Sequence, residues 1–184
     1  MPRDLVERAM AGDHDAFSEL ARIAIGRLYV IARLILREDA AAEDATQEAL
    51  VAAWQHIRAV RDPDKFEAWL HKTLVRACYR EYARRTRRRT FEGRVAMIEP
   101  SSPDTSDHLA DRDELERGFR RLDLDQRTVL VTHYYLGLGL DEAAVVLGIP
   151  PGTVRSRLHR ATRAMRATLD ADARAHAVAG GRIS

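Results

Sequence analysis

The chain has 184 residues, which suits one or two small domains. Hydrophobic residues make up 46% and charged residues 32%, yet the formal net charge is only +2, so the distribution of charge is more informative than its total. The one cysteine, Cys78, excludes an intramolecular disulfide and favours a reducing, cytoplasmic location. No segment typical of a signal peptide stands at the start, and the most apolar stretch, "LYVIARLIL", is too short for membrane insertion.

The first half of the chain has the periodicity of α-helices. Apolar residues recur at helical spacing over residues 15–36, and a second helix is expected over about 40–57, with small alanines, Ala52 among them, on its packing face. The Asp-Pro-Asp in "RAVRDPDKF" predicts a loop. A third helix should begin near Pro63 or Asp64 and run to about residue 89, since proline is common at the first helical position.

The composition changes after this first domain, which we place at residues 1–92. The next stretch, "EGRVAMIEPSSPDTSDHLADRDELE", is rich in proline, serine and acidic residues, a composition that predicts an acidic flexible linker at residues 93–110. Helical periodicity resumes in "ELERGFRRL", so a second domain is expected at residues 111–170, followed by a tail at 171–184 that extends the last helix only briefly. No strand pattern is found, which predicts an all-α fold of two small helical domains.

Near the end of the chain, "IPPGTVRSRLHRATRAMR" has the pattern of a basic amphipathic helix. Its apolar residues follow the spacing i, i+4, i+7, i+11 and form one narrow face: Val154, Leu158, Ala161 and Met165. Thr153 is the expected N-cap, and Gly152 permits a tight entry. The preceding "LDEAAVVLGIP" predicts a short helix ending at Gly148, so the whole segment has the pattern of a helix-turn-helix.

The charge of this helix favours contact with DNA. Arginine can pair bidentately with guanine and can neutralise phosphates, which makes binding depend steeply on salt. The alternative is a solvated surface helix, since basic residues on a helix often have no partner. Residues 147–169 contain almost no balancing acid, and the preceding helix and turn have suitable lengths, so we favour the DNA-binding interpretation.

The stretch "LGIPPGTVRSRLHRA" resembles the second helix-turn-helix signature of bacterial sigma factors of the extracytoplasmic-function (ECF) group. In that group this helix contacts the −35 promoter element. The resemblance implies a −35 DNA-binding set: Thr153, Arg155, Ser156, Arg157, His159 and Arg160. Response-regulator output domains share this motif, but a receiver domain with strands would precede it there, and this chain has helical patterns instead.

A polar helix face in the first half supports the same family. Its residues fall at i, i+1, i+4 and i+5: Glu43, Asp44, Gln47 and Glu48. Taken alone, this face could be an ordinary solvated surface with acids favoured by the helix dipole. However, the segment "AAEDATQEALVAAWQHI" closely resembles the sigma segment that binds core RNA polymerase, and the resemblance implies that role for the four residues.

The following stretch, "RDPDKFEAWLHKTLVRACYREYARRTRRR", resembles the DNA-melting segment of the family, in which the loop at residues 59–65 captures a base flipped from the −10 element. The helix after it is strongly basic, and within it only Glu81 opposes the charge, which favours an anionic partner over a nonspecific basic tail. The family often has Asn and Asp at positions 76 and 80, so their replacement by arginine indicates more phosphate contact. The implied −10 DNA-binding set is Arg61, Asp62, Lys65, Lys72, Arg76, Arg80 and Arg84.

Together these resemblances imply a sigma factor with a region 2 helical bundle and a region 4 helix-turn-helix. Its expected partners are core RNA polymerase (the β′ and β subunits), promoter DNA and an anti-sigma factor. The alternative is a freestanding helix-turn-helix transcriptional regulator. An enzyme is not expected, because the histidines are scattered and no Gly-rich phosphate loop is present, and neither a cofactor nor a metal is expected, because Cys78 has no second ligand at metal spacing.

Overall fold

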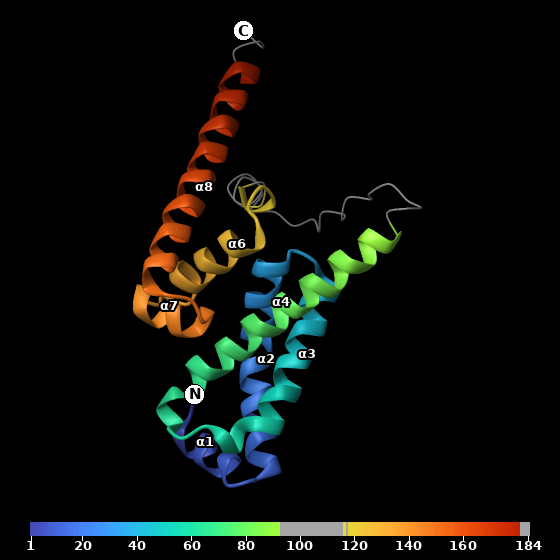
Figure 1. Ribbon diagram of the computed structural model, residues 1–184, viewed down its shortest axis with the longest axis vertical. Helices are drawn as coiled ribbons and strands as arrows, with labels where there is room; N and C mark the ends of the chain where they lie inside the picture. Colours follow the sequence, from blue (N-terminus) through green and yellow to red (C-terminus); the bar gives the residue numbers. More distant parts are fainter. Residues whose placement is uncertain (93–115, 117, 181–184) are drawn as a thin grey trace. The chain divides into compact units, whose positions relative to one another are not determined.

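The computed structural model describes residues 1–92, 116 and 118–180 (Figure 1). The described residues form helices without a strand, which confirms the all-α class, and the chain divides into two compact units that are treated separately below. The predicted linker, residues 93–110, lies outside the described residues.

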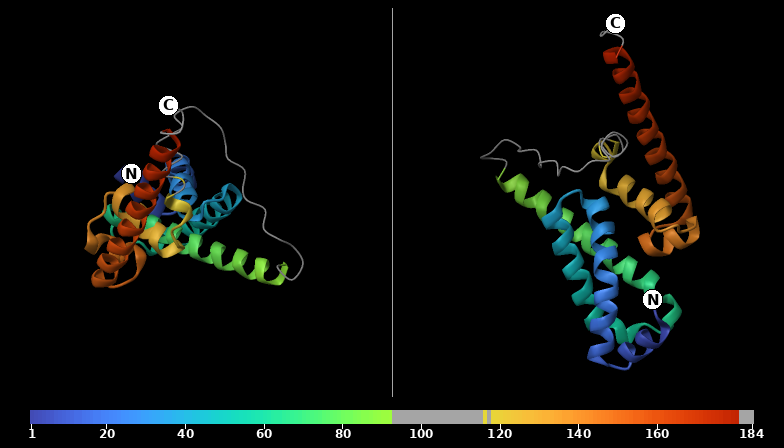
Figure 2. Two further views of the ribbon diagram at one scale, coloured as in Figure 1. Left: turned by 90° about the horizontal axis from the view of Figure 1, so that it is seen from above. Right: turned by 180° about the vertical axis from the view of Figure 1, so that it is seen from behind.

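The N-terminal unit contains four α-helices and two short 3-10 turns. They are α1 (Arg3–Met10), α2 (His14–Leu36), α3 (Asp39–His56), η1 (Ile57–Ala59), η2 (Pro63–Lys65) and α4 (Phe66–Glu92). Helices α2, α3 and α4 pack against one another, as the views in Figures 1 and 2 agree, and α1 packs against α2. The three helices predicted for this half are therefore confirmed, whereas α1 was not predicted as a separate element.

The break between α1 and α2 has a local cause. Gly12 adopts a φ of 101°, a conformation that glycine reaches without steric cost. Asp13 then caps α2, because its side chain accepts hydrogen bonds from the backbone N–H groups of Asp15 and Ala16, both at 3.0 Å. A glycine followed by an N-cap residue was the sequence signal for this boundary.

Small residues let α3 approach its neighbours closely. Ala45, Ala49 and Ala53 follow i, i+4 spacing on α3, and all three are fully buried. Ala52, expected on the same face, is only half-buried because it lies off this row. The alanine face therefore brings the polar side chains beside it close to α4.

The C-terminal unit contains α6 (Leu124–Leu130), preceded by helical residues at 118–120; α6 continues as a π-helical turn over Val131–Tyr135 and packs against α8. A capping box starts α6: the backbone N–H of Gln126 donates to Asp123 at 2.7 Å, and the Gln126 side chain accepts from the backbone of Asp123 at 3.1 Å. Next come α7 (Leu140–Leu147) and the long helix α8 (Pro151–Gly180). The predicted helix-turn-helix is thus present as α7, a turn and α8.

Two predictions about α8 were wrong. The helix begins at Pro151, and the backbone N–H groups of Thr153 and Val154 already donate to the Pro150 carbonyl, so Thr153 lies in the first turn and is not the N-cap. Proline fits the first helical position because its missing N–H would have no partner there. At the other end α8 continues to Gly180, well into the expected tail, since "ADARAHAVA" is rich in alanine, the strongest helix former.

Candidate nucleic-acid interface

Helix α8 separates its apolar and basic residues onto opposite sides. Of the predicted apolar face, Val154 and Ala161 are fully buried and Leu158 and Met165 are half-buried, so this face holds the helix in the C-terminal unit. Gly148, with a φ of 68°, forms the turn that leads from α7 toward α8. The exposed residues of the predicted −35 set are Arg155, Ser156, His159 and Arg160. Four of the six residues of the predicted set are therefore exposed to solvent.

Arg157 has a different environment from the other arginines of that set. Its guanidinium lies 2.8 Å from the Asp125 carboxylate of α6, and its side chain is 26% exposed. The ion pair ties α8 to α6, so Arg157 helps to orient the helix. Thr153 is half-buried, and its carbonyl accepts a 3.0 Å hydrogen bond from Ser156. No sequence spacing pointed to Asp125 as a partner, because only the fold brings these helices together.

The loop predicted to capture a base is held at both ends by apolar residues. Val60 and Phe66 are buried on either side of it. Asp62 accepts a 3.0 Å hydrogen bond from the backbone N–H of Asp64 and thereby caps η2. Arg61 and Lys65 are exposed, with the Lys65 ammonium 3.8 Å from the Asp62 carboxylate. The anchored loop thus presents two cations, Arg61 and Lys65, and two carboxylates, Asp62 and Asp64, to solvent.

The basic residues of α4 fall into two groups. Lys72 and Arg76 form no ion pair within the described part of the chain, and Arg76 is exposed. Arg80 and Arg84, in contrast, both pair with Glu48 of α3: Nε of Arg80 lies 2.5 Å from one carboxylate oxygen, and Arg84 donates to the other. Two residues of the predicted −10 set therefore meet one residue of the predicted polymerase-binding set.

A third arginine extends this contact between α3 and α4. Arg85 donates to Glu38 and, at 2.7 Å, to Glu81, and it lies 3.7 Å from Asp44. The expectation that only Glu81 opposes the basic run is therefore wrong, since three carboxylates from outside α4 oppose it as well. Sequence analysis missed Glu38 because no helical periodicity relates it to residues on α4.

The face predicted to bind polymerase is mostly exposed. Glu43, Asp44 and Gln47 are exposed on α3, whereas Glu48 is half-buried against α4. Burial raises the pKa of Glu48, but hydrogen bonds from Arg80 and Arg84 lower it more, and the net pKa lies below the usual range. Glu48 is consequently ionised at neutral pH.

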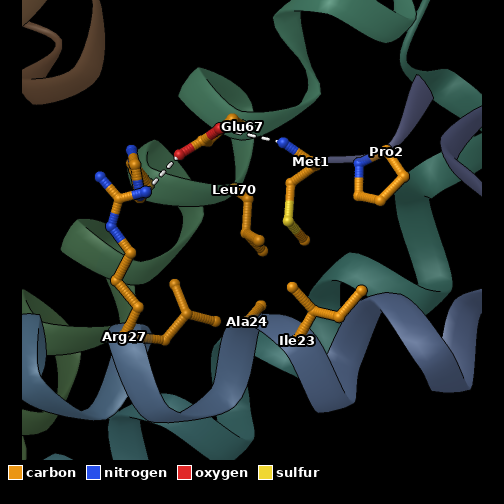
Figure 3. A pocket seen from close by; sticks show the side chains of 9 residues that line it. Met1, Pro2, Ile23, Ala24, Arg27, Glu67 and Leu70 are labelled. Carbon is orange, nitrogen blue, oxygen red and sulfur yellow. Dashed lines mark hydrogen bonds and ion pairs between the residues drawn. The ribbon is translucent and has the colours of Figure 1, made fainter.

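A pocket of about 350 Å³ opens between α2 and the start of α4 (Figure 3). The Met1 side chain points into it beside Leu70 and Ile23, and Arg27 pairs with Glu67 at its edge at 2.7 Å. Glu67 and Arg84 are separated by 17 positions of one helix, or roughly 25 Å along its axis. The pocket is therefore distinct from the α3–α4 contact.

His71, which also lines this pocket, predicts how stability depends on pH. Burial is the main cause that lowers its pKa; Glu67 opposes the effect and Arg27 adds to it. In the unfolded chain, His71 has its ordinary pKa of 6.5, so it takes up a proton at a higher pH there than in the folded chain. The free energy of unfolding should decrease as the pH falls through that value and level off below the lowered pKa of the folded state.

The variant for comparison with the parent chain is His71→Leu, which replaces the titrating imidazole with an apolar side chain. Both tryptophans, Trp54 and Trp69, lie in the N-terminal unit, so urea denaturation followed by tryptophan fluorescence reports this unit alone. We expect the variant to lose less stability than the parent chain between pH 7 and pH 5. Equal losses in the two chains would contradict the account of His71.

Nucleophilic chemistry has little support in the described residues. Burial raises the pKa of Cys78 to about 12, which keeps its thiol protonated at neutral pH. Over residues 1–92, 116 and 118–180, no group of three or more His, Cys, Asp or Glu side chains is placed to hold a metal ion.

Among the described helices, none combines the length and the apolar character that crossing a bilayer requires.

Comparison with known proteins bears on both units. Residues 20–88 match the model of Sigma-70 region 2, and residues 112–165 match the model of Sigma-70, region 4. The curated ECF RNA polymerase sigma factor SigL of Mycobacterium tuberculosis is 38% identical to this chain over 141 residues, which cover 74% of this chain and 79% of SigL. A chain with these two regions has the composition of a promoter-specificity subunit of RNA polymerase.

Solved structures agree with this class. CnrH, solved in complex with the cytosolic domain of CnrY, is 30% identical with a TM-score of 0.65, and the match covers 92% of this chain and 97% of CnrH. The sigma factor RpoE of Bartonella quintana, solved with the anti-sigma factor NepR, shares the fold at 22% identity and a TM-score of 0.71, over 85% of this chain and 98% of RpoE. The chain belongs to the ECF family of RNA polymerase sigma factors. Its function is promoter-specific transcription initiation, and sigma factors are not known as a family of enzymes.

Proposed function

We propose that the two units divide promoter recognition between them. Residues 1–92 act as region 2, which binds core polymerase and recognises and melts the −10 element. Residues 111–170 act as region 4, which recognises the −35 element, while residues 93–110 connect the two. The observation that carries this proposal is the exposed basic face of α8 above a buried apolar stripe, because it provides a rigid helix that fits a major groove.

The −35 element is contacted by α8. Arg155 and Arg160 are exposed and form no ion pair with another described residue. Their guanidinium groups are therefore available for bidentate pairing with guanine edges. Thr153, Ser156 and His159 supply shorter contacts. Arg157 contributes mainly by fixing α8 on α6 through Asp125.

The −10 element is opened by the loop before α4 and by α4 itself. Arg61, Asp62 and Lys65 border the place of the flipped base, and Lys72 and Arg76 approach the phosphates. Melting then requires no chemistry by the protein, only tighter binding of unpaired than of paired DNA. The chain accordingly acts as a binding subunit and not as an enzyme.

Core polymerase is bound through the polar face of α3. Glu43 and Gln47 form its outer row, and their exposure allows them to meet basic side chains of a polymerase subunit (β′ or β). An anti-sigma factor is a further partner, as NepR is for RpoE of Bartonella quintana. We place the chain in the cytoplasm, where polymerase and promoter DNA are found.

A gel-shift experiment with and without core polymerase tests this function. The chain should shift promoter DNA strongly only when core polymerase is added, because each unit alone contributes a modest interface. Tight, sequence-specific binding of duplex DNA by the chain alone, unchanged by polymerase, would instead establish a freestanding helix-turn-helix regulator.

A further inference from the structure

Glu48 lies at the junction of the two proposed interfaces of the N-terminal unit. The four polar residues of α3 form two i, i+4 rows. Glu43 and Gln47 form the outer row, while Asp44 and Glu48 form the inner row, which meets the arginines of α4. Both carboxylate oxygens of Glu48 are occupied, one by Arg80 and the other by Arg84. A polymerase cation that approaches Glu48 must therefore compete with these two arginines for the carboxylate or share it with them.

The two arginines are held to different degrees. Arg80 has Glu48 as its one ion-pair partner among the described residues. Arg84 lies between two carboxylates, since its Nε is also 3.0 Å from Glu81. The two arginine side chains are about half exposed, at 49% and 50%, while the Glu48 side chain is 29% exposed. Ion pairs with this degree of exposure are weak, so a competing charged partner can displace them.

We propose that Glu48 couples polymerase binding to DNA binding within the N-terminal unit. In the free chain its carboxylate occupies Arg80 and Arg84. When basic side chains of core polymerase approach the α3 face, they take over this carboxylate, and the two guanidinium groups become available to the phosphates of −10 DNA. This inference rests on the proposed function and adds a regulation of the same site.

The coupling has a direction that follows from charge. A carboxylate beside the arginines lowers the positive potential that phosphates meet, so losing it must strengthen DNA binding by the free chain. Linkage makes the effect reciprocal: if polymerase strengthens DNA binding through Glu48, then DNA must strengthen polymerase binding by the same factor. Removing the two arginines frees the same carboxylate, so it should strengthen polymerase binding as well. A purely structural ion pair would predict neither gain.

The first experiment measures DNA binding by the free full-length chain. Glu48→Gln keeps the size of the side chain and removes its charge, and a fluorescein-labelled single-stranded deoxyoligonucleotide is the probe in fluorescence anisotropy. We expect Glu48→Gln to bind the probe about five-fold more tightly at low salt. The affinity should also fall more steeply with salt, by about one to two additional released counterions.

Glu19→Gln is the matched control, because it removes the same charge from another surface ion pair, that between Glu19 and Arg22 on α2 at 2.5 Å. We expect its affinity for the probe to remain close to that of the parent chain. If Glu48→Gln and Glu19→Gln bind the oligonucleotide equally, the release of two specific arginines is ruled out.

The second experiment measures binding to core polymerase without DNA. In the double variant Arg80→Gln/Arg84→Gln, Glu48 is free, and we expect the labelled chain to bind core polymerase several-fold more tightly than the parent. Weaker or unchanged binding would overturn the coupling while leaving the proposed function intact. If the parent chain itself does not bind core polymerase, the proposed function fails instead, so the two failures are distinguishable. Thermal melting of each variant verifies that the fold is retained.

Discussion

Replacing Arg155 and Arg160 together by alanine should abolish discrimination of the −35 element. The two side chains are exposed on the N-terminal half of α8, the part of a recognition helix that contacts base edges. Each bidentate arginine–guanine contact contributes about 1–3 kcal/mol of discrimination. The double variant should therefore lose about 30-fold or more in the ratio of transcription from a promoter with an intact −35 element to one with a scrambled element.

Arg166→Ala is the control on the same helix. Arg166 is exposed three turns beyond Arg155 and lies on nearly the same side of α8. We expect this change to weaken binding to all promoters by a similar, modest factor, as the loss of a phosphate contact does. If Arg166→Ala loses discrimination while the double variant retains it, the proposed position of the helix in the groove is wrong.

Phe66→Ala should destabilise the N-terminal unit by about 3–5 kcal/mol, a cost typical of deleting a fully buried phenylalanine. Phe66 is 1% exposed, begins α4 and packs near Trp69, with ring centroids 5.9 Å apart. Because it also anchors the loop that carries Arg61 and Lys65, the variant should lose −10 recognition along with stability. Urea denaturation followed by tryptophan fluorescence measures the change in this unit.

Phe17→Ala provides the comparison, since Phe17 is only half-buried and packs against Trp54, with ring centroids 5.0 Å apart. Its loss of stability should be clearly smaller than that of Phe66→Ala. Equal losses for the two variants would contradict the conclusion that Phe66 is the principal aromatic anchor of the N-terminal unit.

The features that sequence predicted well are those set by local periodicity. Val154 and Ala161 were expected on one face of a helix, and the structure buries both of them. The alanines of α3 were expected to pack, and Ala45 and Ala49 do so, because i, i+4 spacing alone places them on one side. The region 2 and region 4 assignments rest on such local segments in their order along the chain.

The features that sequence missed depend on contacts between helices. Arg85 meets Glu38, and Arg157 meets Asp125, across separations that no helical period relates. In the sequence, the arginines of α4 therefore had few acidic residues near them, whereas in the fold carboxylates from outside α4 pair with them. The start of α8 was missed for a different reason: consecutive prolines at 150 and 151 define that start, and a threonine two residues later resembled an N-cap.

Run-off transcription with purified core polymerase tests the central claim most directly. A library of genomic promoter fragments is transcribed with core polymerase alone and with the chain added. The account predicts discrete transcripts that appear only with the chain and that share a −35 and a −10 sequence at constant spacing. Transcripts that are identical with and without the chain, together with sequence-specific duplex binding by the chain alone, would contradict it.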